Sequence, residues 1–339
     1  MQTTNTNVTP GGGGRIAFFD AIKAFMIFCV VYWHISIYTG TTDSPMNRIY
    51  MPFFLTSFFF ISGYFSYHER TMTPQDYIKK ILKRVKVLLI PTAIMCTLYS
   101  LWSGKSAYQV LFSDMKGGYW FTFVTFEIYL FYILIESCLK DNRSYKTIIY
   151  FLLIVGFSAL TAIGHKWNNI DTYKILSVYQ FMKYLPFFYL GVISRLYQDQ
   201  FFRLLKSDSL LGLGIVAMVM LYLIHNRISM CIQGYLGIFL ICGLFYKFRY
   251  TFDQDNYLVK LIIKIGQSTL PIYFLHYFFL NGITVLSGPF QIIMNEGGWV
   301  INGILSSVTA LFIISLCIFV DKITSISPTL HLGLFGTRR

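Results

Sequence analysis

Charged residues are scarce in this chain of 339 residues. Only 13% of the residues are Asp, Glu, Lys or Arg, whereas 55% are hydrophobic, including 33 Phe and 25 Tyr. Soluble domains carry roughly 25% charged residues. The composition excludes a disordered chain and a collagen-like repeat. Since a soluble core would not bury this much apolar surface, the composition indicates an integral membrane protein.

Cysteine pairs and nucleotide-binding motifs are also missing. The six cysteines lie inside apolar runs and form no CxxC pair, which argues against a disulfide framework or a zinc site. The sequence contains no Walker motif, no dinucleotide-binding glycine motif and no HExxH. We therefore expect neither a bound metal nor a bound cofactor.

Long apolar runs fill most of the chain. Each approaches the roughly 20 residues that a helix needs to cross the hydrocarbon. Because the runs are continuous rather than alternating, helices are favoured over barrel strands. We predict an all-α bundle of about ten transmembrane helices in a single domain, residues 15–325, between a disordered tail, 1–14, and a C-terminal tail, 326–339. The runs are 16–38, 50–67, 87–102, 119–139, 147–164, 175–194, 209–225, 230–246, 268–286 and 300–320.

Basic residues are distributed unequally between alternate loops. With the N-terminus inside, 21 of the 28 Lys and Arg fall on the cytoplasmic side and 7 outside. The positive-inside rule then predicts cytoplasmic termini and a multi-pass protein of the cytoplasmic (inner) membrane. Topology and attraction to anionic membrane lipids explain the net charge of +13. Because the basic residues are dispersed among short loops, we expect no nucleic-acid partner.

The first span carries three ionisable residues at helical spacing. Asp20, Lys23 and His34 are separated by close to whole numbers of turns, with Lys23 near the cytoplasmic end and His34 toward the outer leaflet. Ionisable groups in a membrane usually face the bundle interior and mark a functional site. The alternatives are a snorkelling Lys23 and an interfacial His34 beside Trp33 and Tyr38.

Later spans carry further polar residues. Glu127 lies near the middle of the fourth span, two turns after Trp120, and is either functional or structurally paired. In the ninth span Tyr273 and His276 share a face, where a hydrogen bond within the bundle is the alternative for His276. Ser62 begins a Ser-Gly pair that permits close helix approach.

A basic segment, YIKKILKRVKVLLIP at 77–91, precedes the third span. Its charges are typical of a cluster that sets membrane topology. Alternatively, Arg84 and the neighbouring lysines supply donors to phosphate groups.

In combination, these segments resemble the membrane-bound acyltransferase family three, the ten-span O-acyltransferases that decorate bacterial glycans. The resemblance extends in family order over about residues 15–320. It is carried by Asp20-x-x-Lys23 followed by ten residues and His34, by FFFISGY at 58–64, KRVKVLLIP at 83–91, GYWF at 118–121 and IGQSTLPIYFLH at 265–276.

The resemblance implies an acyl-CoA co-substrate, most often acetyl-CoA, on the cytoplasmic side. It implies a hydroxyl acceptor on a cell-surface glycan or lipid-linked saccharide, and hence O-acetylation of a cell-envelope polysaccharide. The family's essential histidine maps onto His34, and its basic partner maps onto Lys23, where Arg is common. Of the family's basic pair before the third span, Arg84 is kept, whereas Val87 replaces the second arginine.

We therefore predict an O-acyltransferase with His34 as general base, either for direct attack or through an acyl-histidine intermediate. Glu127 is the second predicted catalytic residue. The alternatives are another acyl group or acceptor, a structural membrane partner, and a transporter or flippase of a glycan or lipid precursor. A transporter would show discontinuous helices and related halves. The predicted donor- and substrate-binding residues are Lys23, Asp20, Arg84, Ser62, Trp120, Tyr273 and His276.

Overall fold

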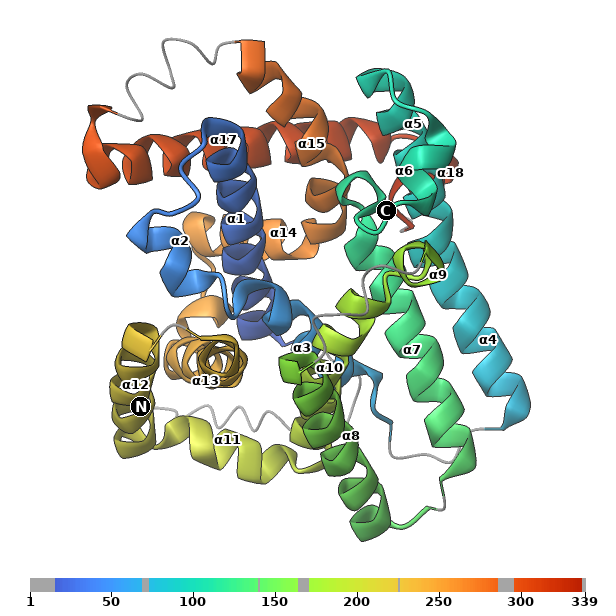
Figure 1. Ribbon diagram of the computed structural model, residues 1–339, viewed down its shortest axis with the longest axis vertical. Helices are drawn as coiled ribbons and strands as arrows, with labels where there is room; N and C mark the ends of the chain where they lie inside the picture. The colour runs from blue at the N-terminus through green and yellow to red at the C-terminus, as the bar shows by residue number, and fades with distance from the viewer. Residues whose placement is uncertain are drawn as a thin grey trace.

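A computed structural model describes residues 16–68, 73–139, 141–163, 171–224, 226–285 and 296–336. Within these ranges the secondary structure is entirely helical, and the helices are joined by turns and short loops (Figure 1). The predicted all-α fold is therefore confirmed. The tail expected at 1–14 lies outside the described residues.

The helices follow the apolar runs of the sequence. Single long helices occupy five of the runs: α1 (Ala17–Thr39), α7 (Trp120–Cys138), α8 (Arg143–Ile163), α13 (Arg227–Lys247) and α17 (Gly298–Thr324). The first half of the chain also contains α2 (Pro45–Tyr50), α3 (Phe54–Ser66), α4 (Pro74–Arg84), the π-helix η1 (Val85–Leu89), α5 (Ile90–Ser103), α6 (Ala107–Phe112) and the 3₁₀ turn η2 (Lys116–Gly118). The second half adds α9 (Asp171–Ile175), α10 (Val178–Leu196), α11 (Gln198–Lys206), α12 (Asp208–Ile224), η4 (Thr251–Asp253), α14 (Tyr257–Gln267), α15 (Thr269–Val285) and α18 (Pro328–Phe335).

Seven helices of the described chain are long and apolar enough to cross a membrane, or up to nine if each of two bent pairs counts as one span. The bent pairs are α11 with α12, at 77°, and α14 with α15, at 80°. The helix α10 coincides with the expected sixth span but is not one of the nine, since Gln180 and Lys183 reduce its apolar character. The chain thus carries several membrane-spanning helices, whereas the count of ten and the orientation stay predictions.

Among the described helices, α3 and α10 make the most extensive contact. A Cβ atom at Gly63 would collide with the backbone carbonyl of Phe188, and one at Gly191 would collide with that of Phe60. Glycine at both positions therefore lets the two backbones touch, as small residues do between membrane helices. The close approach expected from the Ser-Gly pair at 62–63 is confirmed.

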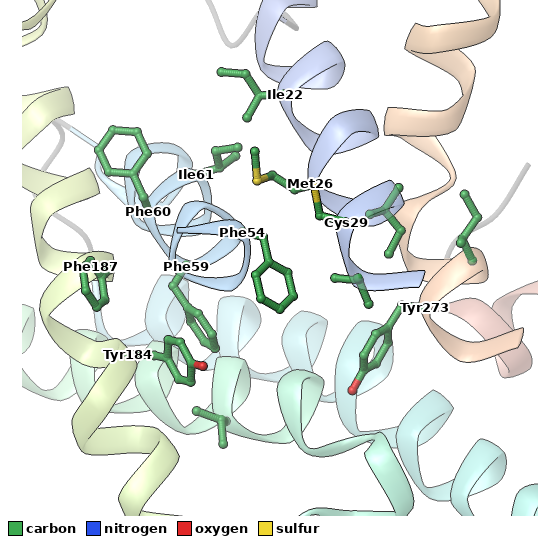
Figure 2. Packing of buried hydrophobic residues seen from close by; sticks show 14 of the residues in the cluster. Ile22, Met26, Cys29, Phe54, Phe59, Phe60, Ile61, Tyr184, Phe187 and Tyr273 are labelled. Carbon is green, nitrogen blue, oxygen red and sulfur yellow. The ribbon is translucent and has the colours of Figure 1, made fainter. Parts of the chain in front are cut away.

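Aromatic rings fill the space around this contact. Figure 2 shows Phe59 of α3 beside Tyr184 of α10, with stacked ring centroids 4.6 Å apart. Trp120, at the start of α7, stacks on the other side of the same cluster, 5.4 Å from Tyr184. Such pairs contribute about 0.5–1.5 kcal/mol each beyond the area that they bury. The aromatic content thus links α3, α7 and α10.

The C-terminal helices pack against N-terminal ones. In Figure 1 the long helix α17 runs across α1 and α15, and it contacts both of them. The short helix α18 then folds back onto α5 and η1. Gly336, which ends α18 with φ of 69°, lies directly against the backbone of Val87. The C-terminal tail expected at 326–339 therefore contains a docked helix.

Candidate active site

His34 lies near the C-terminal end of α1, where it meets α15. Its Nε2 is 2.9 Å from the hydroxyl oxygen of Tyr277, and its ring centroid is 5.1 Å from that of His276. His34 is partly exposed, whereas Tyr277 and His276 are buried. Within the described chain, no hydrogen bond involves the other ring nitrogen of His34, Nδ1. Among these residues, Tyr277 is thus the side chain that hydrogen-bonds to the His34 ring.

His276 has a fixed orientation inside the bundle. Its Nδ1 is 3.1 Å from the carbonyl oxygen of Ile272 one turn earlier, so that nitrogen carries the proton and donates. Its Nε2 is buried and has no hydrogen-bond partner among the described residues. The ring of His276 thus fits the alternative of a hydrogen-bonded bundle residue, yet it lies beside the predicted base.

Tyr273 connects α15 to the loop that precedes α7. Its hydroxyl donates to the carbonyl of Gly118 at 2.8 Å and accepts from the backbone N–H of Phe121 at 3.2 Å. The hydroxyl of Tyr119 donates in the opposite direction, to the carbonyl of Phe274 at 3.0 Å. Three hydrogen bonds therefore hold the GYWF segment at 118–121 against the helix that carries His276.

Lys23 and Asp20 form an ion pair on α1. The Lys23 Nζ is 2.5 Å from Asp20 Oδ1, as the i,i+3 spacing predicts. The side chain of Asp20 is 4% exposed and that of Lys23 is 24% exposed, so the cation still reaches solvent or a ligand. Gly266 at the end of α14 lies against the Asp20 backbone and brings α14 close to the pair.

Glu127 faces a buried lysine that the sequence did not identify as a site residue. Lys116 in η2 is 3% exposed, and its ammonium group donates to the carbonyls of Leu111, Ser113 and Ile175 at 2.7–3.3 Å. Burial lowers the pKa of Lys116, and the charge of Glu127 opposes that shift. In the sequence, the feature that could have pointed to Lys116 is the pair of glycines that follows it. In the structure, Lys116 itself has a positive φ of 44°.

One carboxylate oxygen of Glu127 is buried without a hydrogen-bond partner among the described residues. Its Oε2 is buried and makes no hydrogen bond within the described ranges. In the same ranges, no hydrogen bond or ion pair joins Glu127, Lys23 and His34 to one another. In the described residues, His34 is hydrogen-bonded to Tyr277, whereas Lys23 is paired with Asp20.

Arg84 ends α4 immediately before the π-helix η1. Its guanidinium lies over the ring of Tyr129, 4.5 Å from the centroid. Desolvation, followed by the positive charges of Lys80, Arg195 and Arg84, lowers the pKa of His68 in the segment after α3. Charges of α4 and α10 therefore act on the segment after α3, and the sequence did not predict this for Arg195 and His68.

Ser62 contributes its backbone rather than its side chain to the interactions seen here. Its carbonyl accepts a hydrogen bond from the Ser66 hydroxyl at 2.6 Å. The position of Ser62 in α3 next to the Gly63 contact therefore fits helix packing.

Two further buried carboxylates have partners within the protein. Glu136 of α7 accepts from the Tyr150 hydroxyl and pairs with Lys146 at 3.4 Å. Asp321 of α17 pairs with His331 of α18 at 2.8 Å and accepts from the Ser268 hydroxyl at 3.0 Å. Both sets connect the ends of helices.

Comparison with known proteins agrees with this arrangement. The sequence profile of acyltransferase family 3, described as an acyltransferase domain, matches residues 16–320. That range contains α1 with His34, α15 with His276, and most of α17. Neither the curated proteins nor the solved structures include a significant match. Because the profile covers most of the chain, this protein is a membrane acyltransferase that belongs to the membrane-bound acyltransferase family three.

Proposed function

We propose that the protein is an acyl-CoA-dependent O-acyltransferase of the cytoplasmic (inner) membrane. It transfers an acyl group, most often acetyl, to a hydroxyl of a cell-surface glycan or lipid-linked saccharide. The observation that carries the proposal is a partly exposed His34 with one ring nitrogen bonded to Tyr277 and the other without a partner in the described chain. The family match supplies the reaction class.

The chemistry requires a base at the acceptor. An alcohol is a poor nucleophile until its proton is removed. Histidine suits this task because its unperturbed pKa of about 6.5 lets it take up and release a proton near neutral pH. We assign this role to His34, and the lone pair on Nδ1 is the group that would accept the proton.

Donor binding is assigned to the basic groups at the ends of α1, α3, α4 and α10. The phosphates of CoA need several cationic donors, and Lys80, Arg84 and Arg195 lie close enough to act together on His68. Lys23 is paired with Asp20, which offsets part of its charge. We assign it to the part of the donor nearest α1. This arrangement retains Arg84 and Lys23 as donor residues and adds the neighbours that the fold brings to Arg84.

We assign supporting roles to the remaining predicted residues. Glu127 supplies a carboxylate with a buried, unpartnered oxygen within the described residues. Trp120 and Tyr273 shape the start of α7 and its contact with α15. We assign Glu127 to the acceptor side of the reaction and the others, with Ser62 and His276, to the walls of the site.

One observation favours the transporter alternative. The pairs α11–α12 and α14–α15 are bent by 77° and 80°, and discontinuous helices are common at transporter binding sites. At the second bend, however, the Ser268 hydroxyl donates to Asp321, which also pairs with His331. That bend is therefore occupied by contacts within the protein, and the enzyme remains the better-supported function.

The test is acyl transfer by membranes of the producing cells supplied with radiolabelled acetyl-CoA. The wild type should place radiolabel covalently on surface glycan. Mass spectrometry of the glycan should show the mass of the added acetyl group. His34→Ala should reduce transfer by about 10²–10⁴-fold, the usual effect of losing a general base. Ile37→Ala, which removes a 48% exposed side chain from the same helix, should transfer normally.

Membrane insertion of each variant is checked by quantifying the protein in the membrane fraction. Near-normal transfer by His34→Ala removes His34 from the reaction. The transporter would be supported instead by two results together. The wild type would place no covalent label on the glycan, and cells with an inactive variant would lack a glycan at the surface.

A further inference from the structure

The hydroxyl of Tyr277 is placed to control the orientation of His34. The two side chains come from α15 and α1, and their 2.9 Å hydrogen bond is the one that His34 makes within the described residues. Tyr277 is 6% exposed, and its ring crosses that of His34 edge-to-face at 4.7 Å between centroids. A buried phenol therefore fixes both the position and the tilt of a partly exposed imidazole.

The phenol is in turn held in place by its neighbours. Its ring packs against Tyr119 at 5.5 Å and Tyr99 at 5.9 Å between centroids. Gly118 leaves the space for the hydroxyl end, because a Cβ atom there would collide with Tyr277, and its φ of 104° disfavours a side chain. Since the hydroxyl of Tyr273 binds the Gly118 carbonyl, this space is part of the fixed contact between α15 and the loop before α7.

We propose that Tyr277 is a positioning residue for His34, an inference that rests on the proposed function. In this arrangement the His34 Nε2–H donates to the Tyr277 oxygen, so the neutral ring carries its lone pair on Nδ1. The tautomer of a histidine is set by the hydrogen bond that its other nitrogen makes. Activated nucleophiles generally have a neighbouring base that a third group orients in this way.

The transfer step balances with this assignment. The acceptor oxygen attacks the thioester carbonyl carbon, its proton passes to Nδ1 of His34, the new C–O bond forms, and the C–S bond breaks. The imidazolium then returns the proton to the CoA sulfur, which leaves as the thiol. The Tyr277 oxygen accepts the same Nε2–H bond throughout, and its own proton is not exchanged.

The kinetic test is Tyr277→Phe, which removes one oxygen and retains the ring. We expect kcat for transfer from acetyl-CoA in native membranes to fall about ten- to a hundredfold, as the loss of one hydrogen bond to a charged group predicts. The KM for acetyl-CoA should change by less than about twofold, since the bond acts on the transition state. The matched control is Tyr235→Phe, which removes a hydroxyl bonded to Ser158 at 2.6 Å between other helices and should leave both constants unchanged.

A spectroscopic readout tests the hydrogen bond without any turnover. In purified protein labelled with nitrogen-15 at histidine, the His34 signals are those missing from His34→Gln. The wild type should show a protonated Nε2 and a bare Nδ1, and Tyr277→Phe should shift both signals. Equal spectra for the wild type and Tyr277→Phe, or a proton on Nδ1 in the wild type, would overturn the proposal.

The two readouts separate the possible failures. Wild-type membranes that transfer no acyl group contradict the proposed function, while the nitrogen signals still test the placement of His34. Wild-type transfer with a normal kcat in Tyr277→Phe rejects the positioning role alone. A fall in kcat accompanied by a lower unfolding temperature and a raised KM assigns Tyr277 to structure instead and also rejects it.

Discussion

At the residue scale, Lys116 shows how a charge is accommodated away from solvent. Its ammonium group donates to the backbone carbonyls of Leu111, Ser113 and Ile175, which lie in or beside α6 and α9. Lys116→Met should lower the free energy of unfolding by about 3 kcal/mol, because the carbonyls lose a charged donor. Thermal unfolding in detergent should show a midpoint lower by about 5 °C. Lys105→Met, at an exposed position in the same part of the chain, provides the control and should unfold as the wild type does. Equal midpoints for both variants would contradict a structural role for Lys116.

Residue spacing along one helix was predictable, whereas partners from other helices were not. The offset of three residues put Asp20 and Lys23 on one face of α1, and in the structure they form an ion pair there. The partner of His34 comes from α15, and only tertiary packing brings Tyr277 to it. Lys116 was counted as an ordinary outer charge for the same reason, since its three carbonyl acceptors are defined by the folded loop.

At the element scale, α18 is fastened to α17 and to the bend between α14 and α15. His331 and Asp321 form a pair with side chains 0% and 1% exposed, and the Ser268 hydroxyl donates to the same carboxylate. Asp321→Asn and His331→Gln should each destabilise the protein by about 3 kcal/mol, the usual cost of breaking a buried pair. The double variant should cost much less than the sum of the two, because the residues act as one unit.

This coupling is measured by a double-mutant cycle on unfolding in detergent. Lys247→Gln, which removes an exposed ion pair with Asp208, is the control and should have little effect. Additive effects of the two buried substitutions would show that α18 does not depend on the pair. The helix itself could not be expected from the sequence analysis, since eight residues at 328–335 are too few for a membrane span and are held in place by tertiary contacts with α5, α15, α17 and η1.

At the scale of the whole molecule, the number of membrane-spanning helices determines on which side of the membrane each basic loop lies. Apolar runs predicted most of the helix positions, because a span must be about 20 residues long and apolar toward lipid. That argument is weakest for α10, whose partners are α3 and α8 and whose surroundings are largely protein. A helix packed in this way tolerates polar residues, so composition alone does not decide whether it crosses the membrane.

Labelling at two exposed positions decides both the crossing and the orientation. Five expected spans separate Lys105 from Asp255, so the two positions should lie on opposite sides of the membrane, with Lys105 outside. If α10 does not cross, four spans remain and both positions lie on one side.

We predict that a membrane-impermeant maleimide labels Lys105→Cys in intact cells and labels Asp255→Cys only after permeabilisation. A Cys138→Ser background removes the exposed native thiol, because the other cysteines are buried or half-buried. Labelling of both positions in intact cells would show that α10 remains on one side, and labelling of Asp255→Cys alone would reverse the predicted orientation.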